Sequence, residues 1–221
     1  MVQLARSIMA AIGSDRYERL KFILLCGAFF LVIGSYTLIK ELRDSIFVAI
    51  VGREYVPLAR ILETIILIPA IFFYSFLVDR LRRYQLLYVY AFFYGIIGFI
   101  CASILGHQVI GLQNTDTSAH RYFGWFFYFF VEGFAPFVVS LFWAFANSVN
   151  SPETAKKNYA WMVSGSKIGG MLSASFAWWL LGWQLKDGSR MFSDVVNHQI
   201  LLCFFSGMVM LIPIVIYFLK K

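Results

Sequence analysis

The hydrophobic positions of the 221-residue chain form six long runs, separated by short polar or basic stretches. Each run is long enough to cross about 30 Å of hydrocarbon as an α-helix. The runs lack the alternation of apolar and polar residues that marks the strands of a transmembrane β-barrel. The sequence therefore predicts an all-α integral membrane bundle. Its six helices are expected at approximately Phe22–Val51, Val56–Val78, Tyr84–Leu105, Tyr122–Val149, Tyr159–Trp183 and His198–Leu219.

Charged residues divide the six runs into two similar triplets. The first, second, fourth and fifth runs contain charged side chains, whereas the third and sixth contain none. This pattern is expected when the last helix of each triplet faces lipid, as in the 3+3 inverted repeat of one six-helix half of a major-facilitator-type transporter. We therefore expect residues 21–221 to form a half-transporter domain, preceded by a cytoplasmic amphipathic arm at residues 1–20.

Composition and charge placement agree with a multi-pass membrane protein. Hydrophobic residues make up 60% of the chain and charged residues only 14%. The net charge is +7, and most Lys and Arg residues fall in the arm, in the loops after the second and fourth runs, and at the end of the chain. By the positive-inside rule both termini are cytoplasmic, and we expect a bacterial inner membrane. The basic excess then indicates topology and contact with the lipid bilayer, and we expect no nucleic-acid partner.

Eight ionisable residues lie inside the apolar runs, and all of them except Glu41, which lies off the shared face of the first helix, are candidate site residues. The eight are Lys40, Glu41, Arg43, Asp44, Arg60, Glu63, Glu132 and Lys167. A charged side chain in the hydrocarbon core costs roughly 2.5–3.5 kcal/mol, so such residues are expected to face a bundle interior or an aqueous cavity. Tyr36, Lys40, Arg43 and Asp44 share one face of the first helix by their spacings of three and four. Lys40 and Arg43 can bind a solute there, or extend to the lipid headgroups.

The charges in the later helices also allow two interpretations each. Glu132 and Lys167 both lie near mid-depth, and form either a gating or coupling pair or an ion pair that only fixes helix packing. Arg60 and Glu63, three residues apart, favour a structural ion pair over a ligand pair. No nucleophile–base pair or metal-ligand spacing accompanies these residues, so we expect neither an enzyme nor a bound cofactor or metal.

Three further patterns predict helix geometry. Gly133 and Pro136 flank the charged residue of the fourth run and are expected to bend the helix and free backbone carbonyls there. Gly165 and Gly169 form a G-x-x-x-G pair, which favours close packing against another helix. The aromatic run at 126–130 is expected to contact mostly lipid or the membrane interface.

Several motifs resemble those of known transporters. The loop after the second run contains Asp-Arg-Leu-Arg-Arg at 79–83. It resembles the cytoplasmic D-R-x-G-R-R element of major-facilitator transporters, with Leu81 in place of Gly. Residues 36–45 read Tyr-Thr-Leu-Ile-Lys-Glu-Leu-Arg-Asp-Ser and are followed by Glu-Tyr-Val-Pro-Leu at 54–58. Later in the chain stand Glu132, then Ser-Leu-Phe-Trp-Ala-Phe-Ala-Asn at 140–147 and Ala-Lys-Lys-Asn-Tyr at 155–159. These longer stretches are similar to the nucleotide transporter family, the ATP/ADP translocases of plastids and obligate intracellular bacteria.

The resemblance covers about Tyr17 to the end and implies a major-facilitator-like fold. Members of that family exchange ATP for ADP or take up nucleotides, so it implies an ATP-binding antiporter. It also implies substrate or coupling roles for Lys40, Arg43 and Glu132. Two positions depart from the family pattern: Arg43 stands where Lys is expected, and Lys167 stands where a neutral polar residue is expected.

Length is the larger departure, because the family has about twelve helices and this chain has six. We expect a homodimer or a second membrane chain to supply the other half. The favoured hypothesis is a nucleotide half-transporter that binds polyphosphate oxygens through charge-assisted hydrogen bonds. Its substrate-binding residues are expected to be Lys40, Arg43, Glu132, Lys167 and Tyr36, and its gating or ion-pair residues Asp44, Arg60 and Glu63. The alternatives are a transporter-derived structural or interaction subunit and a carrier for another anionic metabolite.

Overall fold

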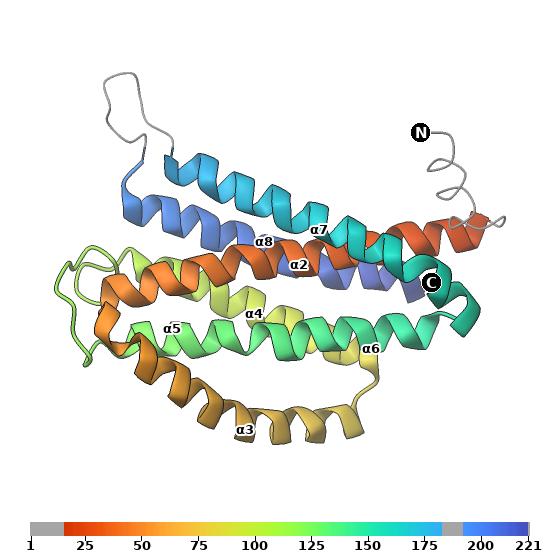
Figure 1. Ribbon diagram of the computed structural model, residues 1–221, viewed down its shortest axis with the longest axis horizontal. Helices are drawn as coiled ribbons and strands as arrows, with labels where there is room; N and C mark the ends of the chain where they lie inside the picture. Colours follow the sequence, from red (N-terminus) through yellow and green to blue (C-terminus); the bar gives the residue numbers. More distant parts are fainter. Residues whose placement is uncertain (1–15, 183–191, 221) are drawn as a thin grey trace.

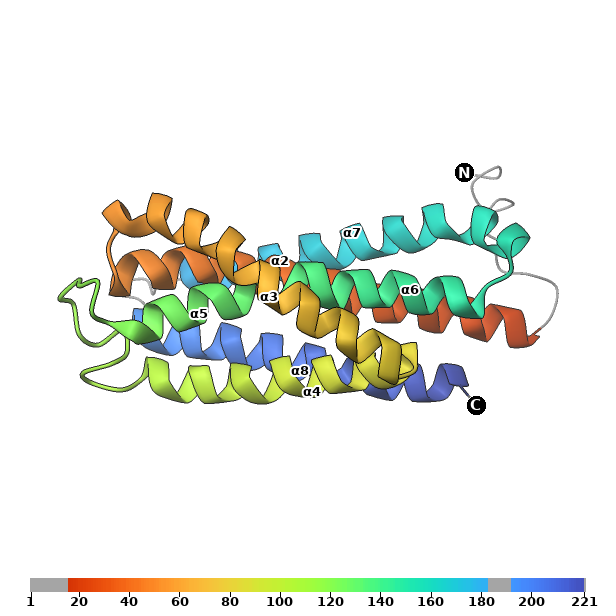
Figure 2. The same cartoon turned by 90° about the horizontal axis from the view of Figure 1, so that it is seen from below.

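The computed structural model describes residues 16–182 and 192–220, which form an all-α bundle (Figure 1). The helices run in alternating directions along one common axis (Figures 1 and 2). Their bounds are α2 (Arg16–Ile50), α3 (Val56–Arg80), α4 (Arg83–Leu105), α5 (Tyr122–Glu132), α6 (Ser140–Val149), α7 (Pro152–Gly182) and α8 (Asp194–Lys220). A short 3-10 helix precedes α3 at Arg53–Tyr55, and a π-helical segment joins α5 to α6 at Ala135–Val139. The predicted helical membrane bundle is therefore confirmed.

The predicted N-terminal arm falls mostly outside the described residues, at positions 1–15. Its last five positions, 16–20, already belong to the first turns of α2. The first membrane helix thus begins before the predicted start at Phe22.

In the described part of the chain, five helical segments are long and apolar enough to cross a membrane. They are Tyr17–Ile50, Arg53–Arg80, Arg83–Leu105, Tyr122–Val149 and Asp194–Leu219. The remaining helix, α7, has 31 residues and is interrupted by Ser, Gly and Lys residues that lower its hydropathy. It nevertheless lies along α2 and runs in the same direction (Figure 1).

Close contact between α2 and α7 depends on glycine. A Cβ atom at Gly169 would lie 2.6 Å from the backbone oxygen of Phe30, closer than any side chain can approach. The predicted packing role of Gly169 is therefore confirmed. Gly165, its partner in the motif, has no atom within 4 Å of such a Cβ position, so it plays no part in this contact.

Replacing Gly169 by alanine is expected to destabilise the bundle by roughly 1–3 kcal/mol, because the added methyl group would push against a backbone atom that cannot move aside alone. The matched control is Gly165→Ala, which places the same methyl group in open space. It should be neutral or stabilising by up to about 1 kcal/mol, since alanine is the better helix former. Thermal unfolding in detergent measures both, and equal effects would show that the α2–α7 contact is looser than described.

The fourth membrane helix is distorted where the sequence predicts a bend. The regular α-helical pattern of α5 ends at Glu132, and the wider π-helical turn at Ala135–Val139 contains Pro136. Proline has no N–H group to donate to the preceding turn, and wider turns of this kind commonly appear at functional sites. The distortion confirms the prediction and leaves Glu132 at a break in the helical hydrogen-bonding pattern.

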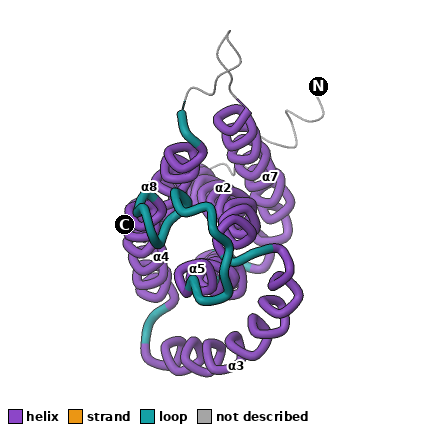
Figure 3. The backbone as a smooth tube through the Cα atoms, turned by 90° about the vertical axis from the view of Figure 1, so that its left-hand side faces the viewer, coloured by secondary structure: helices purple, strands orange, loops and turns teal. Residues whose placement is uncertain are grey.

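The two triplets of helices do not pack equivalently. α7 lies tightly along α2, whereas α3, which holds the corresponding place in the first triplet, bows away from α5 and α6 (Figures 1 and 3). Ala59 is the one buried residue of α3, and the helix contains Pro69 near its middle. α4 and α8 pack against each other and expose an apolar face each, as expected for lipid-facing helices.

Candidate functional site

The centre of the site is Arg43, near the end of α2. Its guanidinium forms an ion pair with the Glu132 carboxylate across the bundle. A second ion pair joins Arg43 Nη2 to Asp44 Oδ1 at 2.8 Å, and Arg43 Nε donates to the same oxygen. The side chains of Arg43 and Glu132 are only 12% and 18% exposed, whereas that of Asp44 is 59% exposed. Charged side chains of α2 and α5 therefore meet at Arg43.

An aromatic platform from α5 supports this arginine. The Arg43 guanidinium carbon lies 4.8 Å from the centroid of the Tyr128 ring, in cation–π geometry. Phe47, one turn after Arg43, packs against Tyr128 and Trp125 with ring centroids 4.9 and 5.1 Å apart. Tyr128 itself is almost fully buried, and sequence reasoning did not identify it.

The beginning of α3 brings two further charges into range. Arg60 borders a groove that Asp44 of α2 also lines, and Glu63 follows Arg60 by about one turn of α3. Within the described residues, however, the expected ion pair between Arg60 and Glu63 is not formed. These two residues instead add one charge of each sign to the edge of the Arg43 cluster.

The two lysines of the predicted site behave differently. Lys40 and Lys167 are exposed, and within residues 16–182 and 192–220 neither forms an ion pair. The expected pairing of Glu132 with Lys167 is therefore wrong, because the Glu132 carboxylate forms its ion pair with Arg43 instead. Tyr36 is half-buried and stacks on Phe134 at a centroid distance of 6.3 Å.

A groove of about 640 Å³, lined by both charged and apolar side chains, opens beside the cluster, between the end of α2 and the start of α3. Its lining includes Asp44, Arg53 and Arg60, along with Val48, Val56 and Pro57. Arg53 comes from the short loop between the helices, and the sequence pattern placed it outside the site. Two arginines and the exposed Asp44 carboxylate thus line one open space.

Arg121 holds the loop between α4 and α5 in place at the end of the bundle where α2 ends. Its Nη1 donates to the carbonyl oxygens of Asn114 and Asp116 at 3.1 and 2.8 Å, and more weakly to Ile50, the last residue of α2. Its Nη2 donates to the carbonyls of Ile110 and Gly111. Burial lowers the pKa of Arg121 and the Asp116 carboxylate opposes that change, so the guanidinium stays charged. The loop at 106–121 is therefore organised by one side chain.

Metal ligands are not gathered anywhere in the described part of the chain. No group of three His, Cys, Asp or Glu side chains is arranged there to hold a metal ion. The Arg43 cluster itself offers charged and aromatic groups for recognition of a ligand.

Comparison with known proteins gives the chain a family. The family model described as TLC ATP/ADP transporter matches residues 5–221. Two similar proteins are each named "ADP,ATP carrier protein 1", one from Rickettsia bellii (strain RML369-C) and one from Rickettsia conorii (strain ATCC VR-613 / Malish 7), both 25% identical. No solved structure matches the chain.

The alignment with each relative covers 66% of this chain but only 33% of the relative, so the chain corresponds to a minor part of those carriers. The family match nevertheless extends over almost the whole sequence, and it confirms the resemblance found in the motifs. It also confirms the prediction that the chain is not an enzyme, because the family consists of transporters. The chain belongs to the TLC ATP/ADP transporter family.

Proposed function

We propose that the chain carries nucleotides across the membrane, by exchange of the ATP/ADP type, as one half of a transporter. The observation that carries this proposal is the Arg43 cluster, which places a charged recognition site inside a bundle of a nucleotide-transporter family. The names of the two Rickettsia relatives support adenine nucleotides as the substrate.

Lys40 would make the first contact with substrate. It is exposed and lies one turn from Arg43 on the same face of α2, so a phosphate group can reach it without breaking an existing ion pair. Arg43 would follow, since a polyphosphate can compete with the Asp44 and Glu132 carboxylates for its guanidinium. Tyr36 lies on the same face of α2 as Lys40 and Arg43.

A second bundle would cover the exposed charges. Lys40 and Lys167 lie well inside α2 and α7, at depths where a lysine in contact with lipid is costly. A second copy of the chain or another membrane chain could enclose them in a wet cavity, and two bundles are what rocking-type alternating access needs. In this arrangement Lys167 adds a second positive charge to the cavity wall.

The orientation follows from the basic residues. α2 begins and α8 ends at the same end of the bundle as Arg80, Arg82 and Arg83 (Figure 1). By the positive-inside rule this end is cytoplasmic, which puts both termini in the cytoplasm. We propose a bacterial inner membrane as the location.

Counterflow of labelled ADP into proteoliposomes loaded with ATP tests the function. Lys40→Gln should lower exchange about 10- to 100-fold, the effect of losing a hydrogen bond to a charged group worth about 1.5–3 kcal/mol. The control is Glu41→Gln, which changes an exposed charge next in sequence but on a different face of α2, and should leave exchange unchanged.

Two results would contradict the proposal. If the unaltered protein shows neither exchange nor a nucleotide-dependent thermal shift and purifies in a stable complex with another chain, it is an interaction subunit. If a panel of anionic metabolites is exchanged in preference to ADP, the substrate class is different.

A further inference from the structure

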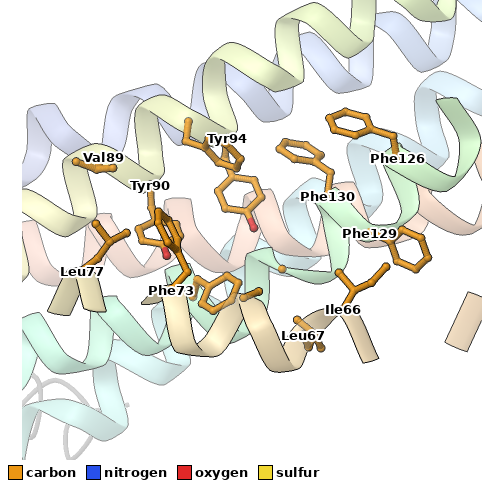
Figure 4. A pocket seen from close by; sticks show the side chains of 14 residues that line it. Ile66, Leu67, Phe73, Leu77, Val89, Tyr90, Tyr94, Phe126, Phe129 and Phe130 are labelled. Carbon is orange, nitrogen blue, oxygen red and sulfur yellow. The ribbon is translucent and has the colours of Figure 1, made fainter. Parts of the chain in front are cut away.

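An apolar cavity of about 390 Å³ separates α3 from α4 and α5. Side chains from all three helices surround it, including Phe73 of α3, Tyr94 of α4 and Phe130 of α5 (Figure 4). The hydroxyls of Tyr90 and Tyr94 are its only polar side-chain groups. The cavity exists because α3 bows away from its neighbours.

A nucleotide does not suit this cavity. Burying a phosphate among aromatic and aliphatic side chains, with no basic residue in the lining, would leave its charge uncompensated. A hydrocarbon chain is the matching ligand, because transfer into such a space is favourable in proportion to the apolar area covered.

Basic residues gather at the end of α3 and in the loop that follows it. Leu77 lines the cavity, and the chain continues within two turns to Arg80, Arg82 and Arg83, with Asp79 as the one acidic neighbour. Arg82 and Arg83 line a second groove of about 510 Å³ together with Leu81 and Tyr84. The guanidinium of Arg80 is held 4.2 Å from the Phe76 ring centroid. Basic pockets of this kind, between membrane helices at the polar boundary, suit anionic headgroups.

We propose that α3, α4 and α5 bind an anionic phospholipid, with an acyl chain in the cavity and the headgroup at Arg80, Arg82 and Arg83. The positive charge of the groove and the apolar lining of the cavity together select this occupant. A zwitterionic lipid has no net charge, so it would gain from the apolar cavity but not from the net positive charge of the groove. The lipid stabilises α3 in its outward position. This inference does not depend on which leaflet faces the basic end, nor on nucleotide transport.

The test uses the full chain in nanodiscs containing a phosphatidylglycerol with a photoreactive diazirine in one acyl chain. Light-induced labels should map to α3, α4 and α5 around Phe73, Phe93 and Phe130. Unlabelled phosphatidylglycerol should compete at least fivefold better than phosphatidylcholine with the same chains. Because this competition uses the unaltered protein, it needs no variant to fold.

Two variants distinguish binding of the acyl chain from binding of the lipid headgroup. Ala70→Trp fills the cavity and should remove the labels, whereas Ile100→Trp, on the exposed face of α4, should leave them. Arg80→Gln with Arg82→Gln should keep the labels but remove most of the preference for phosphatidylglycerol, so that the two lipids compete almost equally in this variant. Labels spread evenly over the lipid-facing surface, or equal competition by the two lipids, would overturn the proposal.

Discussion

Exchange of labelled ADP is expected to fall at least 100-fold in Arg43→Gln, with a loss of up to about 3 kcal/mol in unfolding free energy. The stability loss arises because Asp44 and Glu132 would then face each other without the cation that joins them. The transport loss arises because the variant removes the guanidinium that pairs with Glu132 of α5 and is proposed to bind phosphate. Counterflow in proteoliposomes and thermal unfolding in detergent measure the two effects separately.

A double variant distinguishes transport from folding. Arg43→Gln with Glu132→Gln removes both charges of the partly buried pair while keeping similar side-chain volumes, so stability should return to within about 1 kcal/mol of the starting protein. Exchange should stay low, because the phosphate-binding cation is still missing. Recovery of exchange together with stability would mean that the pair only holds the helices in place.

The positions of the membrane helices were predictable because hydrophobicity alone sets them. The fourth helix was expected at Tyr122–Val149, and α5, the π-helical segment and α6 cover that range. The pairing inside the site was not predictable. Glu132 and Lys167 have similar depths, but depth does not fix the rotation of a helix about its axis. In the structure Lys167 points outward, and Arg43 meets Glu132 instead.

The aromatic run of α5 shows a second limit of sequence reasoning. It was expected to contact mostly lipid, and this is wrong for Phe127 and Tyr128, which are buried in the core. A run in which every residue is aromatic has no apolar–polar period, so the pattern cannot indicate the inward face. That ambiguity concealed Tyr128, the residue on which Arg43 rests.

The site contains one paired cation and one exposed cation. Arg43 is paired with Glu132 and Asp44, while Lys40 is exposed. If the site binds nucleotide as proposed, binding separates Arg43 from at least one carboxylate, and release of the substrate restores the ion pair. We expect the released Glu132 to turn toward Lys167 or the second bundle while substrate is bound, which would couple occupancy to the distorted turn at Ala135–Val139.

Arg121→Ala is expected to lower the unfolding free energy by about 3 kcal/mol or more, because hydrogen bonds from a charged donor contribute about 1.5–3 kcal/mol each and this side chain reaches five carbonyls. The loop at 106–121 should lose its order first. Hydrogen–deuterium exchange should therefore rise sharply in that loop and at the end of α2, which Arg121 also contacts through Ile50.

The same experiment separates the geometry of Arg121 from its charge. Arg121→Lys keeps the charge but provides three donors from one atom, which cannot reach carbonyls on both sides of the guanidinium, so it should recover less than half of the lost stability. His120→Ala changes the exposed neighbour and should cost less than about 0.5 kcal/mol. Full recovery in Arg121→Lys would show that charge alone orders the loop. Because Ile50 follows Phe47 by three residues on α2, loss of the loop contacts should also loosen the aromatic platform under Arg43 and lower exchange several-fold.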